Sequence, residues 1–148
     1  MKRLYSLLLF LLFFAGIHSA TASHVVGGEI SYTWISGNTY QLKLSYYRDC
    51  MGVSAPTSVN ISASSSCFPT PQTVIATASA NSPQLISPVC SSVLSNCNGG
   101  QYNGIEKWEY KANITLPGNC SDWIFSYTEC CRNGMITNLN QPSGASAY

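Results

Sequence analysis

Seven cysteines are the residues of this sequence best suited to chemistry, because a thiolate is both a nucleophile and a metal ligand. They are Cys50, Cys67, Cys90, Cys97, Cys120, Cys130 and Cys131. All of them follow an N-terminal segment with the features of an export signal, so disulfide bonds are their expected chemistry. Zinc is the alternative, but the chain beyond that segment has a single histidine, His24, and no cysteine pair at zinc-finger spacing. We therefore predict no metal site and no cofactor.

The pairing of these cysteines stays open at the level of sequence. An odd number leaves one thiol without a partner in this chain, and the other six can pair in about 15 ways. We favour the short loops, Cys90 with Cys97 and Cys120 with either Cys130 or Cys131. The last two are adjacent, so in a strand their sulfurs face opposite ways and reach separate partners, with a strained bridge between neighbours as the alternative.

A catalytic centre has little support in the remaining polar residues. A serine or cysteine nucleophile would need His24 as its base, and the sequence lacks the G-x-S-x-G pattern of a nucleophile elbow. The six carboxylates follow no calcium-loop pattern, and any choice of two as a glycosidase pair would be arbitrary. We predict that the protein is not an enzyme, and a secreted hydrolase centred on His24 is the alternative.

The overall charge and composition exclude further classes of protein. The 148 residues include 7 Lys+Arg and 6 Asp+Glu, a net charge of +1, which offers no basic excess for binding nucleic acid. A chain with 45% hydrophobic and 11% aromatic residues is too apolar for intrinsic disorder. Its length is that of one domain.

The first 22 residues have the pattern of a secretory signal peptide. Lys2 and Arg3 precede an apolar run over residues 7–17, which is too short to span a bilayer as a helix. Residues 20–22, Ala-Thr-Ala, then match the small-residue pattern of a cleavage site. We expect cleavage before Ser23, with an uncleaved anchor as the alternative. No second long apolar stretch follows, so residues 23–148 are expected to be a secreted or cell-surface domain without a transmembrane span.

The rest of the chain has the alternation of β-strands. Apolar and polar residues alternate over residues 30–34, 40–46, 108–116 and 123–127, and more weakly over 59–63 and 74–78. Side chains in a strand point to opposite faces in turn, so each run offers one face to a core. Turn residues at 36–38 and 117–119 predict tight hairpins between the first two runs and between the last two. These features predict an all-β fold, an antiparallel immunoglobulin-like sandwich of two sheets that is stapled by disulfides.

Aromatic residues support two different predictions. Trp34, Trp108 and Trp123 fall on the faces expected to point inward, so we predict that they pack in the core, with a sugar-stacking platform as the alternative. Tyr47 follows Tyr46 directly and must point to the opposite face, which makes it the candidate for an exposed contact. A carbohydrate-binding module, with Tyr47 and neighbouring aromatic rings stacked on sugars, is therefore the alternative function.

Five short segments together carry a resemblance to a known group of proteins. They are SHVVGGEI at 23–30, LSYYRDC at 44–50, NCSDW at 119–123, ECCRN at 129–133 and ITN at 136–138. This combination resembles the N-terminal region of large surface proteins of gliding Gram-negative bacteria. Those proteins often carry PKD-like or other immunoglobulin-like repeats and a C-terminal gliding-motility-associated domain that serves type IX secretion.

The resemblance implies export across two membranes, a cell-surface or extracellular location, and an adhesive or structural role. It offers no catalytic residue, and the repeats and the sorting domain are not in this sequence. Residues 145–148 have the pattern of a strand that is only beginning, so we expect the chain to be a piece of a longer protein. The predicted partner is a protein or glycan on a surface, of unknown identity.

Overall fold

The computed structural model describes residues 25–87, 89, 90, 92–129, 146 and 147. The expected signal peptide, His24, Cys130 and Cys131 lie outside the described residues. Within them the elements are β1 (Val25–Ser36), β2 (Thr39–Asp49), β3 (Ser58–Ser65), β4 (Phe68–Ala78), β5 (Gln84–Leu85), the 3-10 turn η1 (Asn96–Asn98), β6 (Ile105–Thr115), β7 (Ile124–Ser126), β8 (Thr128–Glu129) and β9 (Ser146–Ala147). All six runs of alternation lie in or overlap strands, and the described residues contain no α-helix, so the all-β prediction is confirmed.

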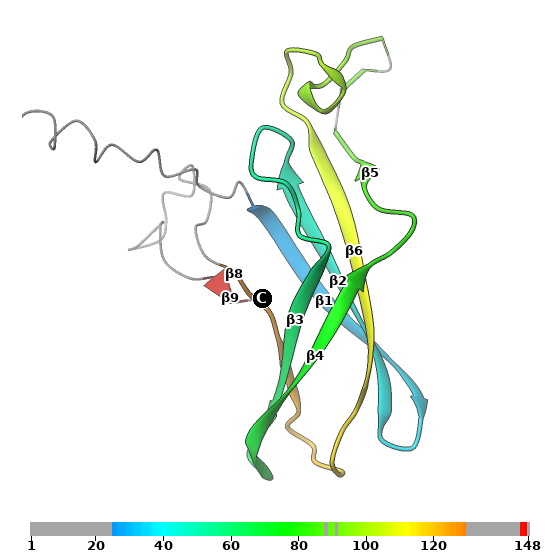
Figure 1. The fold of residues 1–148 in the computed structure, drawn as a ribbon, viewed down its shortest axis with the longest axis vertical. Coiled ribbons are helices and arrows are strands. Elements are labelled where there is room, and N and C mark those ends of the chain that lie inside the picture. Colours follow the sequence, from blue (N-terminus) through cyan, green and yellow to red (C-terminus); the bar gives the residue numbers. More distant parts are fainter. Residues whose placement is uncertain (1–24, 88, 91, 130–145, 148) are drawn as a thin grey trace, which may run out of the picture.

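One antiparallel sheet makes up most of the molecule, in the order β1-β2-β6-β4-β3-β7, with β5 also paired to β6. β2 pairs with β6 along its whole length, but β4 pairs with β6 only at Thr77 and Ala78. The sheet folds over at this short contact, so β1-β2-β6 and β4-β3-β7 become two layers (Figure 1). The antiparallel, disulfide-linked sandwich is therefore confirmed, with the difference that both layers belong to one sheet that forms a near-barrel.

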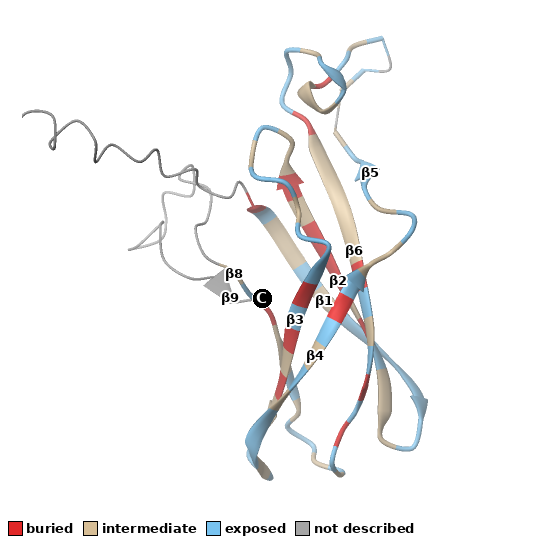
Figure 2. Ribbon diagram, in the orientation of Figure 1, coloured by how far each residue is buried: buried red, intermediate tan, exposed pale blue. Residues whose placement is uncertain are grey.

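The core lies between these two layers and follows the alternation of the sequence. Leu42, Leu44 and Tyr46 of β2 are buried, as are Ile61 of β3 and Tyr110 of β6. Figure 2 shows the buried positions on β2, β3, β4 and β6, while the loops at both ends of the body are largely exposed. Fully burying one such side chain stabilises a fold by about 1.5–3 kcal/mol, so this face explains why the strands form.

One of the two predicted hairpins is confirmed and the other is wrong. β1 and β2 are joined by a tight turn in which Gly37 has a φ of +51°, a conformation that favours glycine. Residues 117–119 do not return β7 to β6, because β7 crosses to the other layer and pairs with β3, for example Phe125 with Ala63. Turn residues predict that the chain reverses there, but they do not select the strand that it then joins.

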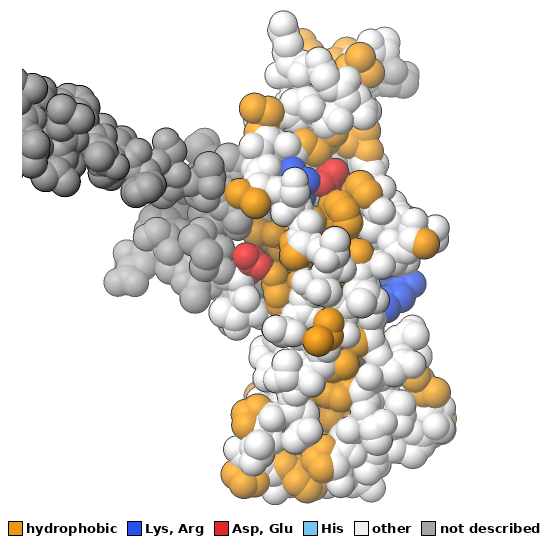
Figure 3. Space-filling view, viewed as in Figure 1, with side chains coloured by type: hydrophobic (Ala, Val, Ile, Leu, Met, Phe, Trp, Pro, Cys, Tyr) orange, Lys and Arg blue, Asp and Glu red, His pale blue; other side chains and the backbone are white. Residues whose placement is uncertain are grey.

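One face of the molecule carries few charged side chains. Hydrophobic side chains form a broken band down the face seen in Figure 3, and few charged side chains lie on it. Within the described ranges, no helix has the length and apolar character needed to cross a membrane.

Candidate functional site

Two disulfides lie at opposite ends of the body. Cys50, just after β2, is bonded to Cys97 in η1, with their Cα atoms 5.1 Å apart. Cys67, in the turn between β3 and β4, is bonded to Cys120 in the loop between β6 and β7, with a Cα–Cα distance of 6.3 Å. Both distances lie in the normal range for disulfides. The bridges thus connect segments 47 and 53 positions apart in the sequence.

The short-loop pairing that we favoured from the sequence is wrong. Cys97 is bonded to Cys50 rather than to Cys90, which is an exposed free thiol. Cys120 is bonded to Cys67 and is therefore not available to either of the adjacent cysteines. The physical reason is that the register of the folded sheet, and not loop length in the unfolded chain, determines which sulfurs meet.

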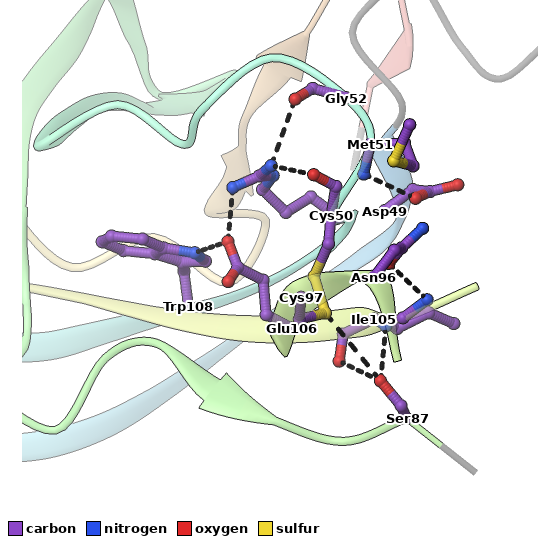
Figure 4. The surroundings of a disulfide bond; sticks show 12 residues. Asp49, Cys50, Met51, Gly52, Ser87, Asn96, Cys97, Ile105, Glu106 and Trp108 are labelled. Atoms are coloured by element: carbon purple, nitrogen blue, oxygen red, sulfur yellow. Dashed lines mark hydrogen bonds and ion pairs between the residues drawn. A yellow bond between two sulfur atoms is a disulfide. The ribbon is translucent and has the colours of Figure 1, made fainter. Parts of the chain in front are cut away.

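The Cys50–Cys97 bridge, which we call the upper bridge, is surrounded by a tightly packed loop (Figure 4). The Cys50 amide donates to the Gly104 carbonyl at 3.0 Å, and the Gly104 amide donates to Asn96 Oδ1 at 2.8 Å. A Cβ atom on Gly104 would lie 2.3 Å from Cys97 Sγ, so only glycine fits beside the sulfur. These contacts hold the loop of Cys97 against the end of β2.

A buried ion pair supports the same loop. Arg48 Nη1 donates to Glu106 Oε1 at 2.5 Å, and Nη2 donates to the carbonyls of Cys50 at 3.2 Å and Gly52 at 3.1 Å. Trp108 Nε1 also donates to Glu106 Oε1, at 2.8 Å (Figure 4). The Arg48 and Glu106 side chains are only 11% and 14% exposed, so this charged pair works as a structural clamp on the chain that follows β2.

The Cys67–Cys120 bridge, which we call the lower bridge, lies beside a hydrogen-bonded carboxylate. Asp122 accepts hydrogen bonds from Ser65 Oγ at 2.7 Å and from the Ser66 amide at 3.0 Å. Hydrogen bonds from Ser66 and Ser65 lower the pKa of Asp122 below its ordinary value. Cys67, Cys120 and Asp122 place ligand-type atoms within 4.8 Å of one another. The two sulfurs are bonded to each other and carry no thiolate charge, so this group is not a suitable metal site.

A cleft opens beside the lower bridge, where the β1–β2 hairpin faces the segment that leads into β7. Its larger cavity has a volume of about 290 Å³ and a smaller one about 140 Å³. The two share Tyr40, Leu116, Cys120, Ser121 and Trp123 as lining residues, so they are one continuous depression. We call it the aromatic cleft; its further lining residues are Tyr32, Asn38, Gly118, Asn119 and Phe125.

Ring contacts fix the walls of the aromatic cleft. The Tyr32 ring lies 6.0 Å from the Tyr40 ring, edge to face, and 5.5 Å from the Phe125 ring. Trp123 is stacked on Phe68 at 5.5 Å, and its Nε1 donates to a backbone carbonyl of the adjoining loop at 3.2 Å. Such aromatic pairs contribute about 0.5–1.5 kcal/mol beyond the area that they bury. The walls are therefore preformed.

The prediction that Trp34 packs in the core is wrong, although the predicted face is right. Trp34 is paired across the hairpin with Tyr40, on the inward side of the sheet, yet Trp34 is 62% exposed and Tyr32 is 63% exposed. β1 and β7 are the two ends of the sheet and do not pair, so among the described strands β1 has no neighbour on the side away from β2. Phe125 of β7 contacts the Tyr32 ring, but it covers these rings only in part. Trp108 and Trp123 are partly buried and pack against the core as expected.

Tyr47, the predicted exposed contact, lies on the outward face of the sheet and is half-buried. Its hydroxyl donates to Glu29 Oε1 at 3.4 Å, and the Lys107 ammonium lies 5.9 Å from the centre of its ring. One face of this ring is thus engaged within the protein. A contact with an external partner through Tyr47 stays a prediction.

Two of the buried core residues are the tyrosines Tyr110 and Tyr127. Tyr110 donates to the Pro56 carbonyl at 2.7 Å, and Tyr127 donates to Glu129. Burial raises the pKa of Tyr110, and burial together with the hydrogen bond to Glu129 raises the pKa of Tyr127. Both phenols are therefore neutral at physiological pH and act as structural hydrogen-bond donors.

Comparison with known proteins gives no relative: the chain matches no protein-family model, no curated protein and no solved structure. The function must therefore be argued from the site itself. The aromatic cleft was not among the sites predicted from the sequence. The available signal was the row of aromatic residues at Tyr32, Trp34 and Tyr40, on both sides of the tight turn.

Proposed function

We propose that the chain is a non-enzymatic extracellular or cell-surface module with an adhesive or structural role, at the N-terminal end of a large secreted surface protein. The observation that carries this proposal is the pair of disulfides at the two ends of the sandwich. Disulfides form and persist in oxidising compartments and are rare in the cytosol. The signal-like segment at residues 1–22 supports the same location.

The positions of the bridges suit a module that must keep its shape outside the cell. Cys67 and Cys120 connect the β3–β4 turn to the loop after β6, and so join the two layers. Cys50 and Cys97 close the other end, where the clamp of Arg48 adds charged hydrogen bonds. Cross-links of this kind restrict the unfolded chain and slow irreversible loss of the fold.

Export and oxidation can be tested on the full chain, expressed with its own leader and a C-terminal tag in a gliding Gram-negative bacterium. We expect a mature N-terminus at Ser23, digestion of the tagged protein when intact cells are treated with protease, and both bridges in non-reducing mass spectrometry. A chain that stays inside the cell at full mass, with every cysteine open to alkylation, would overturn the proposal.

The adhesive and the structural role are separated by a replacement experiment. The module is exchanged for an unrelated sandwich domain of similar length, and attachment of the cells to surfaces is compared with that of a strain lacking the module. Attachment that survives the exchange indicates a structural role, because a spacer depends on length and rigidity. Attachment that is lost in both strains indicates that the surface of this module makes the contact.

A further inference from the structure

We propose that the aromatic cleft binds a neutral polysaccharide chain. This inference deepens the proposed function, since it rests on the adhesive role and names the class of ligand. Three observations carry it: the exposed rings of Tyr32, in the cleft, and Trp34, beside it, are held in place; the described lining residues are uncharged; and these two rings follow one another along β1.

The exposed rings are fixed rather than free to turn away. Trp34 and Tyr32 are more than half exposed, yet Trp34 Nε1 donates to the Gly37 carbonyl at 2.9 Å. Tyr32 is held between the rings of Tyr40 and Phe125. Exposure of large apolar rings costs solvation free energy, and fixing them lowers the entropy lost on binding. Rigid, exposed rings of this kind are suited to stacking on the C–H faces of sugars.

The polar groups of the cleft match hydroxyl groups of a ligand rather than charges. The polar residues that line it carry amide or hydroxyl side chains: Asn38, Asn119, Ser121 and Tyr40. No charged side chain is among the described residues that line either cavity. Amides and hydroxyls donate and accept hydrogen bonds, as a polyhydroxyl ligand requires. An acidic glycan would find no cationic partner here.

The dimensions indicate a chain that crosses the cleft rather than a ligand that is enclosed by it. The cavities are at or below the lower end of the range for drug-sized ligands, about 300–1,000 Å³. Tyr32 and Trp34 are two positions apart on one face of β1, which separates them by about 7 Å along the strand. One sugar unit in the cavity beside Tyr40 and Trp123 can therefore continue into units that lie over these two rings.

The test uses the purified, oxidised protein and five neutral hexasaccharides: cellohexaose, laminarihexaose, xylohexaose, mannohexaose and chitohexaose. Binding is measured by calorimetry and by tryptophan fluorescence, since Trp123 lines the cleft and Trp34 is paired across the hairpin with the lining residue Tyr40. The test variants are Trp34→Ala and Tyr32→Ala, whose exposure allows truncation without loss of the fold. Tyr102→Ala, a change of a ring that is 60% exposed and lines neither cavity, is the matched control.

We expect saturable binding of at least one hexasaccharide, weakened about tenfold by Trp34→Ala or Tyr32→Ala and unchanged by Tyr102→Ala. No binding to any of the five at millimolar concentration overturns the inference, as does binding that all three variants retain or all three lose. Hexagalacturonate is measured beside them as an acidic comparison ligand. Binding to it alone, removed by salt, would replace the neutral ligand with an acidic one and also overturns the inference.

These outcomes are independent of the test of the proposed function. A protein that is exported with both bridges but binds none of the saccharides removes the glycan ligand and leaves the surface module. A purified chain that binds a hexasaccharide through Trp34, but is retained in the cell with free thiols, removes the surface module and leaves the cleft.

Discussion

Removal of the Cys67–Cys120 disulfide should destabilise the fold strongly. The bridge between Cys67 and Cys120 closes a loop with a sequence separation of 53. In the chain-entropy account, a loop of that length restricts the unfolded chain by about 4 kcal/mol. Domains of this size have total stabilities of about 5–15 kcal/mol, so the double variant Cys67→Ala/Cys120→Ala should lose a large part of its stability.

The assay is equilibrium unfolding in urea, followed by tryptophan fluorescence, because Trp123 packs beside the bridge on Phe68. We expect a loss of about 4 kcal/mol, a fall in Tm of about 15 °C, and a larger m-value because the unfolded chain becomes less compact. Cys90→Ser is the matched control, since Cys90 is an exposed free thiol and its replacement should change stability by less than about 0.5 kcal/mol.

The result that would refute this reasoning is a double variant within about 1 kcal/mol of the unmodified protein. It would mean that the unfolded chain already keeps the two ends of this loop together. A large loss in Cys90→Ser would be equally contrary, because it would indicate that this thiol has a partner in the oxidised protein.

Three further predictions concern the glycine beside the Cys50–Cys97 bridge, the buried ion pair and the buried tyrosines. Gly104→Ala should cost about 1–3 kcal/mol in urea unfolding, because its Cβ would clash with Cys97 Sγ, and an unchanged midpoint would contradict that contact. Arg48→Met should cost about 3 kcal/mol, because it leaves the buried carboxylate of its partner without its cation; a midpoint within error of the unmodified protein would show that the clamp is not needed. Burial raises the pKa of Tyr110 and Tyr127 above the ordinary value of 10.0, so the stability from their neutral forms is complete below about pH 10 and declines at higher pH, where the unfolded tyrosines ionise first. Urea midpoints that stay constant from about pH 8 to 11 would oppose this assignment.

The strands could be predicted from the sequence because their cause is local. Leu42, Leu44 and Tyr46 recur at every second position, and the structure buries all three on one face of β2. The tight turn at Gly37 was likewise predictable, since its positive φ favours glycine. Alternation and turn residues report which way a side chain points and where the chain reverses. Both properties are set within a few residues.

The disulfide pairs and the aromatic cleft could not be predicted, because they depend on contacts between distant segments. Cys50 meets Cys97 because β2 pairs with β6 in the register that places Asp49 opposite Ile105, next to the loop of Cys97. Trp34 has the direction expected from the sequence, but its exposure follows from the short β7, which pairs with β3 instead of covering β1. The alternation of apolar and polar residues within a strand does not indicate which other strand it pairs with, so neither pairing could be predicted from it.

The two bridges also overlap along the chain, since Cys67 lies inside the loop closed by Cys50 and Cys97, while Cys120 lies outside it. If the protein is pulled by its two ends, the shortest covalent path from Cys50 to Cys120 runs through residues 50–67 and then across a sulfur–sulfur bond. A fully stretched chain reaches about 3.5 Å per residue, so this part could lengthen to only about 60 Å, against roughly 240 Å without cross-links. The two bridges therefore limit how far the part between Cys50 and Cys120 can lengthen under force, even after its sheet has unfolded.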